Sequence, residues 1–180
     1  VCVRGDSQLT TKRSLPKRLL KRVTHTALLR AFDAAVYVGQ RNRDYYLHYG
    51  YPERRLHYSP HAVDTNRFLR AASLDARTDL RRTLGVASNV RLVLFAGKLV
   101  PFKRPLDTAA AVQLLRQRGI NTELMVAGSG ELENALRSRA RELSVPLHDL
   151  GFRNQTQMPS AYAAADALVL PSTARETWGL

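Results

Sequence analysis

Apolar and polar positions alternate between two patterns along this chain. Short runs of consecutive apolar residues predict buried strands, and the segments between them carry apolar residues at helical spacing. The predicted strands are residues 34–38, 56–59, 92–96, 123–127, 147–150 and 167–170. The predicted helices are residues 15–32, 40–49, 106–118, 131–142 and 158–165, with a further helix between Asp75 and Gly85. Strands alternating with helices predict an α/β fold, a parallel sheet with helices on both faces.

Two blocks are separated by residues 61–70, which we expect to form a connector. Positive charge is concentrated in the first block. Residues 1–70 hold 14 Lys/Arg against 5 Asp/Glu, whereas residues 71–180 hold 14 against 10, and the net charge is +13. The densest cluster lies in and before the first helix, at Lys12, Arg13, Lys17, Arg18, Lys21 and Arg22. Such a cluster attracts anionic membranes, nucleic acid or acidic substrates, but it is equally typical of a solvated helix face.

The composition is that of a globular protein with a hydrophobic core. Hydrophobic residues make up 44% of the 180 residues, an ordinary share for a soluble domain. The single cysteine, Cys2, excludes an internal disulfide and favours the cytoplasm. No apolar run approaches the roughly 20 residues that span a bilayer. Because the chain begins with Val1 and stops just after a glutamate motif, we expect an internal piece of a longer protein.

Residues suited to binding a phosphorylated sugar follow the predicted strands. Gly97 allows a sharp turn, after which Lys98 and Lys103 can neutralise a diphosphate. The segment Gly128-Ser129-Gly130 precedes a predicted helix, whose first amides favour anions. Glu176 can accept hydrogen bonds from sugar hydroxyls. Ligands bind at the carboxyl ends of parallel strands, so we expect these groups at one edge of the sheet.

Each of these signals also has a plainer interpretation. Exposed loops commonly carry lysines, a lone Gly-x-Gly is usually a tight turn, and a glutamate near a helix start can simply complement the helix dipole. We expect no metal site, because Pro60 separates His57 from His61 and prevents a shared helical face. The tyrosines of residues 45–51 could stack on bases, but packing of an amphipathic helix is the favoured interpretation.

Taken in order, the motifs resemble those of a known family. The order is Gly97-Lys98, Lys103, Gly128-x-Gly130-Glu131, Gly151-Phe152, Tyr162-x3-Asp166, Pro171-Ser172 and Glu176-x2-Gly179. It resembles the donor-binding half of retaining "group 1" glycosyltransferases, which include sucrose synthases and phosphatidylinositol mannosyltransferases. The resemblance covers residues 30–180 and implies a GT-B fold, two facing Rossmann-like domains. Residues 1–70 would then be the end of the first, acceptor-side domain with its linker, and residues 71–180 the nucleotide-sugar-binding domain, truncated at its C-terminal end.

The resemblance also implies a role for each matching residue. Lys98, where the family usually has Arg, and Lys103 would bind the nucleotide diphosphate, and Phe152 would lie beside the base. Glu176 would lie at the donor sugar as the catalytic carboxylate. Further donor contacts would come from Gly97, Gly128, Gly130, Ser172, Gly179 and Leu180, the last two through backbone amides. The implied reaction moves a sugar from a nucleotide-diphosphate donor to a hydroxyl acceptor with retention of configuration, without a cofactor or a metal.

Two departures from the family bear on activity. Lys98 keeps the charge of the usual Arg but lacks its planar, bidentate fork. The second glutamate of the family's E-x7-E motif would fall eight residues after Glu176, beyond Leu180. We therefore expect residues 1–180 alone to be inactive even if the parent is an enzyme.

Three functional hypotheses remain open. The first is the glycosyltransferase, whose basic helix at residues 12–30 would contact an anionic membrane carrying the acceptor. Its acceptor would be a sugar, a glycan or a lipid-linked group, and its location the cytoplasm, peripheral at the inner face of the membrane. The second hypothesis is a non-catalytic α/β domain that binds a nucleotide or a sugar phosphate. The third is a membrane- or nucleic-acid-binding module that acts through the basic helix, with nucleic acid the less favoured partner.

Overall fold

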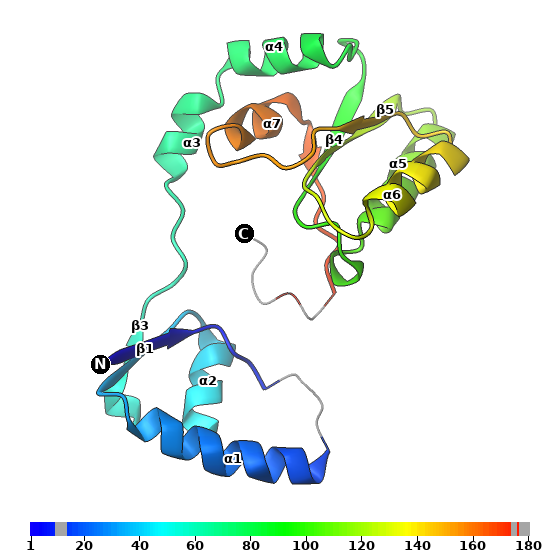
Figure 1. The fold of residues 1–180 in the computed structure, drawn as a ribbon. Helices are drawn as coiled ribbons and strands as arrows, with labels where there is room; N and C mark the ends of the chain where they lie inside the picture. Colours follow the sequence, from blue (N-terminus) through cyan, green and yellow to red (C-terminus); the bar gives the residue numbers. More distant parts are fainter. Residues whose placement is uncertain (10–13, 174–175, 177–180) are drawn as a thin grey trace. The chain divides into compact units, whose positions relative to one another are not determined.

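The computed structural model describes residues 1–9, 14–173 and 176. The chain forms two compact units, Val1–Val63 and Asp64–Leu180, whose helices and strands are labelled in Figure 1. The sequence predicted a boundary after residue 70, whereas the second unit already begins at Asp64. The difference arises because residues 64–70 pack onto the second unit.

The first unit is built on a parallel sheet in the order β1-β2-β3. Its strands are β1 (Cys2–Gly5), β2 (Ala34–Tyr37) and β3 (Leu56–Tyr58). Its helices are α1 (Leu15–Arg30), α2 (Gln40–His48) and the short 3-10 helix η1 (Glu53–Arg55). β1 was not predicted from the sequence, because four residues are too few to reveal an alternating pattern. β1 is defined by its pairing with β2, in which Cys2 lies opposite Ala34.

Tyrosines form most of the core of the first unit. The buried cluster contains Leu29 of α1, Ala35 of β2 and four tyrosines, Tyr45, Tyr46, Tyr49 and Tyr51. The predicted packing of these tyrosines is therefore confirmed. Burial raises the pKa of Tyr46, since a phenolate is poorly solvated there. The Tyr51 hydroxyl donates to the carbonyl of Phe32 at 3.1 Å, which satisfies a polar group inside an otherwise apolar cluster.

The second unit has a four-stranded parallel sheet in the order β6-β5-β4-β7. Its strands are β4 (Arg91–Ala96), β5 (Thr122–Ala127), β6 (Leu147–Asp149) and β7 (Ala167–Leu168). Its helices are α3 (Thr65–Ala71), α4 (Leu74–Thr83), the 3-10 helix η2 (Pro101–Lys103), α5 (Pro105–Gln117), α6 (Glu133–Glu142) and α7 (Met158–Ala164). β7 is shorter than predicted, and Leu168 is exposed on it because β7 lies at an edge of the described sheet.

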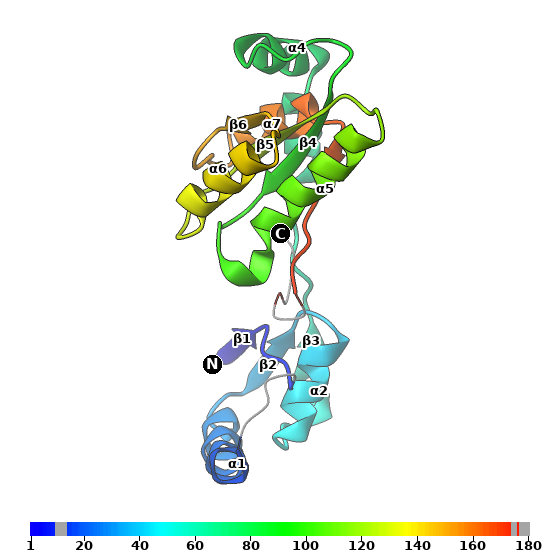
Figure 2. The same cartoon turned by 90° about the vertical axis from the view of Figure 1, so that its right-hand side faces the viewer.

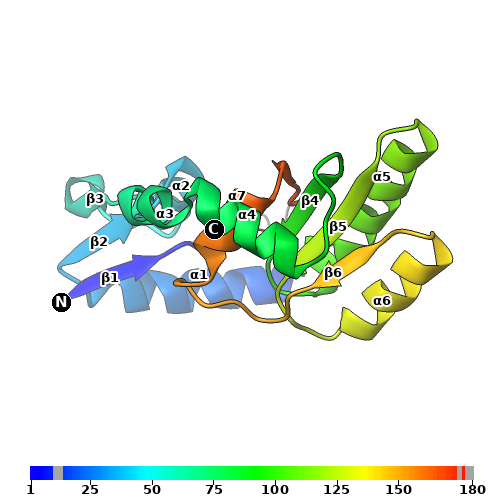
Figure 3. The ribbon, with the colours of Figure 1, turned by 90° about the horizontal axis from the view of Figure 1, so that it is seen from above.

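Alternation along β4 sends apolar side chains to both faces of this sheet. Val93 and Phe95 enter one core with residues of α5 and α6. Leu92 and Leu94 enter the other core, which Ala161 and Ala164 of α7 complete. Figures 2 and 3 show α5 and α6 on one side of the sheet and α7 with α4 on the other. The prediction of a parallel sheet covered on both faces is confirmed for this unit.

Helix α3 corrects the expectation that residues 61–70 form a connector. The side chain of Asp64 caps the helix by accepting a hydrogen bond from the Arg67 amide at 2.9 Å. Phe68 lies against Tyr162 of α7, with ring centroids 6.1 Å apart. These residues are too polar to show a helical apolar stripe, so the cap and the contact with α7 define the helix.

An ionic cluster ties α4 and α7 to β4. Asp166, which follows α7, receives hydrogen bonds from Arg77 at 2.7 Å, from Arg81 at 3.3 Å and from the Leu92 amide at 2.7 Å. Arg81 also donates to the carbonyls of Ala164 and Val90, at 2.9 and 2.6 Å. The cluster therefore joins three elements at the amino end of β7, opposite the edge where the candidate site lies.

Candidate active site

The predicted site residues follow strands of the second unit. The loop after β4 carries Gly97, Lys98 and η2, the loop after β5 carries residues 128–132, and residues 169–173 and 176 follow β7. Because these strands are parallel and adjacent, the three segments emerge at the same edge of the sheet.

Close backbone contacts join the loops after β4 and β5. The Gly97 amide donates to Ala127 O and the Leu99 amide to Ser129 O, both at 2.9 Å, and the Leu132 amide donates to Leu99 O at 3.0 Å. A Cβ atom on Gly128 would lie 1.9 Å from Gly97 O, and one on Gly130 would lie 2.6 Å from Leu99 O. Only glycine fits at either position, because a side chain would overlap the neighbouring backbone.

This contact changes the interpretation of the Gly128-Ser129-Gly130 motif. The predicted helix from Glu131 starts instead at Glu133, after a turn in which Gly130 O accepts from the Glu133 amide at 3.1 Å. The Gly128 amide donates to Gly151 O at 2.8 Å. The glycines thus have a structural role in loop contact, and their role in donor binding stays a prediction.

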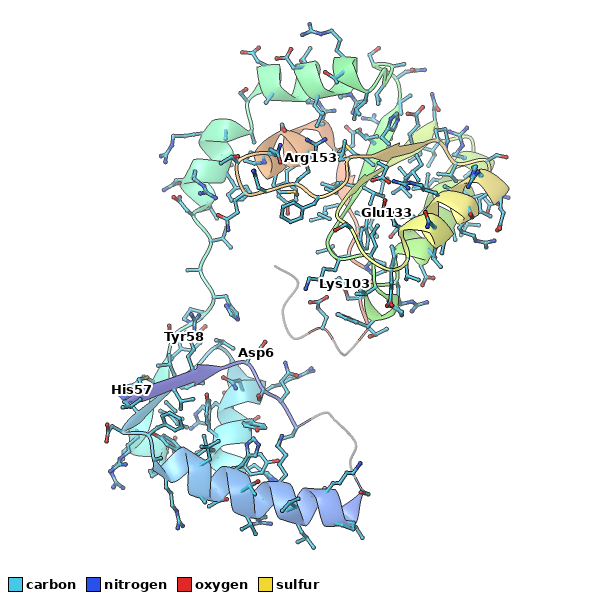
Figure 4. The ribbon with its side chains drawn as sticks, in the orientation of Figure 1. Asp6, His57, Tyr58, Lys103, Glu133 and Arg153 are labelled. Carbon is cyan, nitrogen blue, oxygen red and sulfur yellow. The ribbon has the colours of Figure 1, made fainter. Side chains whose placement is uncertain are left out.

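Lys103 and Glu176 meet at this edge of the sheet. The distance from Lys103 Nζ to Glu176 Oε2 is 2.8 Å, and the two side chains are only 13% and 17% exposed. Ser172 Oγ donates to the same carboxylate oxygen at 3.0 Å. In Figure 4, Lys103 extends from η2 towards the segment that follows β7. The structure therefore brings together three of the residues predicted to bind the donor.

Backbone geometry places Lys103 at this position. It is the last residue of η2, and Arg104, in the left-handed region at φ 52°, turns the chain into α5. The Thr173 amide donates to Phe102 O at 2.8 Å, which joins the segment after β7 to η2. The contact between Lys103 and Glu176 was not predicted from the sequence, because no local spacing pattern connects residues so far apart.

Two of the remaining predicted residues, Lys98 and Phe152, are exposed. Lys98 is exposed on the loop after β4. Phe152 is 74% exposed after β6, and the preceding turn is stabilised by a hydrogen bond from the Gly151 amide to Asp149 Oδ1 at 2.9 Å. Gly179 and Leu180 lie outside the described residues.

The described part of the chain carries neither a metal cluster nor a membrane-spanning helix. It holds no group of three or more His, Cys, Asp or Glu side chains placed to hold a metal ion. None of its helices combines the length and the hydropathy needed to cross a membrane.

The fold and this edge define the class of protein. Two α/β units with parallel sheets, one with polar side chains gathered at the carboxyl end of its strands, share the GT-B fold of solved glycosyltransferases. Residues 76–180 match the family model "Glycosyl transferases group 1". The chain belongs to this family, which confirms the resemblance to group 1 glycosyltransferases found in the sequence.

Relatives and solved structures agree with this assignment. A D-inositol 3-phosphate glycosyltransferase of Geodermatophilus obscurus is 32% identical over 144 residues, 74% of this chain and 31% of the relative. A GDP-mannose-dependent phosphatidylinositol monomannoside mannosyltransferase of Corynebacterium glutamicum is 28% identical over 116 residues, 64% of this chain and 30% of the relative. The chain thus corresponds to about a third of the length of these relatives.

Two solved structures share the fold at low sequence identity. Anabaena HepE, crystallised with UDP and glucose, has a TM-score of 0.71 at 20% identity, with coverage of 96% of this chain and 46% of HepE. WaaG, a glycosyltransferase involved in lipopolysaccharide biosynthesis, has a TM-score of 0.70 at 21% identity, with coverage of 95% of this chain and 50% of WaaG.

Proposed function

We propose that the whole protein transfers a sugar from a nucleotide-diphosphate donor to a hydroxyl acceptor, and that the second unit binds the donor. The observation that carries this proposal is the meeting of Lys103, Ser172 and Glu176 at the carboxyl edge of the sheet. A cation, a hydroxyl and a carboxylate together suit a ligand that has both phosphates and sugar hydroxyls. HepE, which shares the fold, was crystallised with UDP and glucose.

Each predicted residue then has a role in donor binding. Lys103, assisted by Lys98, neutralises the diphosphate, and Glu176 with Ser172 accepts hydrogen bonds from the sugar. The exposed ring of Phe152 lies beside the base. Gly128 and Gly130 allow the backbones of two loops to approach closely, and Gly97 lies against the side chain of Lys103. Gly179 and Leu180 would add backbone amides near the sugar and its phosphate.

The reaction proposed retains the configuration at the anomeric carbon. The bond between this carbon and the diphosphate oxygen breaks, the acceptor oxygen bonds to the carbon on the same face, and the acceptor proton passes to the leaving diphosphate. Lys103 stabilises the negative charge that develops on the leaving group. We expect no metal requirement, since lysine can supply this positive charge.

The acceptor proposed is a sugar, a polyol or a lipid-linked glycan in glycolipid or polysaccharide synthesis. The relatives support this class of acceptor, because one is named for D-inositol 3-phosphate and another for a phosphatidylinositol mannoside. Both names describe a polyhydroxylated ring that carries a phosphate.

Turnover with purified full-length protein tests this proposal. UDP-, GDP- and ADP-hexoses would be assayed with inositol phosphate and lipid-linked acceptors, with and without EDTA, and the product's anomeric configuration determined by NMR. We expect one donor to be used with retention, and Glu176→Gln to lower kcat by about 100-fold. Glu142→Gln, a matched change on α6, should keep full activity. Nucleotide binding without turnover for any pair would favour the non-catalytic hypothesis instead.

Residues 1–180 expressed alone test the expectation of inactivity. The family's second glutamate would fall eight residues after Glu176, so we expect no turnover from this piece. Turnover at the full-length rate would contradict that expectation.

We further propose that α1 contacts an anionic membrane on the cytoplasmic side. Leu19, Leu20 and Val23 form an apolar strip on α1, each 66–70% exposed. Lys17, Arg18 and Arg22 are exposed on the same helix. An apolar face beside cations is the pattern of a helix that lies in a membrane interface. Lys21 is not counted among these exposed cations, because its ammonium lies over the Tyr45 ring, 4.9 Å from the ring centroid.

Co-sedimentation with vesicles containing phosphatidylglycerol tests this contact. Replacing Lys17, Arg18 and Arg22 by Gln should weaken binding by about 100-fold, at about 1 kcal/mol for each charge. The control replaces three exposed arginines elsewhere, Arg54, Arg70 and Arg118, so that the change in net charge is the same. Equal binding by both variants, or binding of duplex DNA in preference to vesicles, would overturn the proposal.

A further inference from the structure

The contact between Lys103 and Glu176 pairs two groups that have different roles in the proposed function. Lys103 is assigned to the diphosphate and Glu176 to the sugar. In the structure, however, Glu176 Oε2 lies 2.8 Å from Lys103 Nζ. A carboxylate therefore sits at the ammonium group that the diphosphate would bind.

Several hydrogen bonds stabilise this contact. Ser172 Oγ donates to Glu176 Oε2 at 3.0 Å. The Glu176 amide donates to Thr173 O at 3.0 Å, and the Thr173 amide donates to Phe102 O at 2.8 Å. The pair is thus supported by backbone bonds on both of its segments, unlike an ion pair between two freely rotating surface side chains.

A carboxylate and a phosphate compete for the same lysine. Both are anions that accept charge-assisted hydrogen bonds from the lysine ammonium, which is a compact point charge. When the diphosphate binds Lys103, Glu176 loses its cation. A bound sugar offsets that loss, because its hydroxyls donate to the freed carboxylate. A nucleoside diphosphate without a sugar offers no such compensation.

We propose that Glu176 is a specificity-determining residue that discriminates the intact nucleotide-sugar donor from its nucleoside diphosphate product. It acts by competing with the diphosphate for Lys103. The inference rests on the proposed function, in which Lys103 binds the diphosphate. Its consequence for turnover is faster release of the product, since the carboxylate returns to Lys103 once the sugar has been transferred.

Calorimetric titration of the full-length protein tests the inference. UDP, GDP and ADP are titrated first, followed by the corresponding nucleotide sugar without acceptor. Glu176→Gln should tighten binding of the nucleoside diphosphate by about three- to tenfold, because the competing charge is gone. The same variant should not tighten binding of the nucleotide sugar. Glu176→Ala should likewise tighten binding of the nucleoside diphosphate without tightening binding of the nucleotide sugar. The control variant Glu142→Gln should change neither affinity.

A double-mutant cycle tests whether Lys103 is the group for which Glu176 and the diphosphate compete. The effect of Glu176→Gln on diphosphate affinity should disappear in a Lys103→Met background, because no ion pair remains to be broken. An effect that persists there would mean simple repulsion between Glu176 and the ligand, and would overturn the inference. Unchanged or weaker diphosphate binding by Glu176→Gln and Glu176→Ala would also overturn it.

Lys103→Met alone tests the proposed function separately. It should weaken diphosphate binding by about tenfold or more. If Lys103→Met leaves that affinity unchanged, the proposed role of Lys103 fails, whatever Glu176→Gln does. If Lys103→Met weakens binding while the Glu176 variants do not tighten it, only the competition is wrong.

Discussion

Gly128 stands at a position where the backbone leaves no space for a side chain. Its Cβ would lie 1.9 Å from the carbonyl oxygen of Gly97, which belongs to the neighbouring loop. Gly85 also has a positive φ, at +69°, but nothing lies within 4 Å of its Cβ position. Gly128, at φ +157°, therefore combines steric overlap with an unfavourable backbone conformation, whereas Gly85 has only the latter.

We expect Gly128→Ala to lower the free energy of unfolding by about 2–4 kcal/mol, because the two loops must move apart. Gly85→Ala should cost only about 1 kcal/mol, the strain of a left-handed alanine. Denaturant unfolding of both variants measures the difference. Equal costs would show that the loops adjust freely, and that the close contact does not constrain this edge.

At the scale of elements, Asp166 holds α4, α7 and β4 together. Burial by itself would raise the pKa of Asp166, but the hydrogen bond from Leu92 and the charges of Arg77 and Arg81 outweigh it and lower that pKa. Because the folded-state pKa lies below the unfolded value, the carboxylate stabilises the fold above about pH 4. This contribution is lost as the pH falls through the folded-state pKa.

Asp166→Asn should therefore destabilise the protein most at neutral pH. We expect a loss of about 2–4 kcal/mol at pH 7, since two arginines lose their anionic partner. The difference from the unsubstituted protein should shrink as the pH falls below about 4 and through the lowered folded-state pKa of Asp166, where the native carboxyl group becomes protonated. Urea unfolding between pH 3 and pH 7 measures this trend. A difference that does not depend on pH would mean that packing alone explains the loss.

At the scale of the whole molecule, the chain consists of two units with different features. The first has a tyrosine-rich core and a cationic helix. The second has the sheet whose edge brings Lys103 and Glu176 together. The proposed function assigns the donor to the second unit, so ligand effects should be concentrated there.

Hydrogen exchange with a saturating nucleoside diphosphate tests this division. Amides of residues 97–104, 128–132 and 169–173 should gain protection, because bound ligand suppresses opening of the loops that it contacts. Amides of β2 and α2, in the core of the first unit, should change much less. Protection centred on the first unit would contradict the assignment of the donor to the second.

Much of this organisation could be predicted from local sequence. Six of the seven strands in the described residues were predicted, and the signal is strongest for β4 and β5, where burial on both faces leaves a continuous run of apolar residues. The ordered motifs after those strands identified the family and the candidate residues, since each motif is a short segment with its own local pattern.

Only the tertiary structure decided which of these residues meet. β1 was found from its pairing with β2, and α3 from its cap and its contact with α7. The tertiary structure also assigned the glycines of the second loop to a backbone contact and paired Glu176 with Lys103. Local sequence reports the propensity and burial of each segment, whereas contacts between distant segments depend on how strands order and loops approach. The family of this protein was therefore evident in its sequence, and the pairing of its charged groups only in its fold.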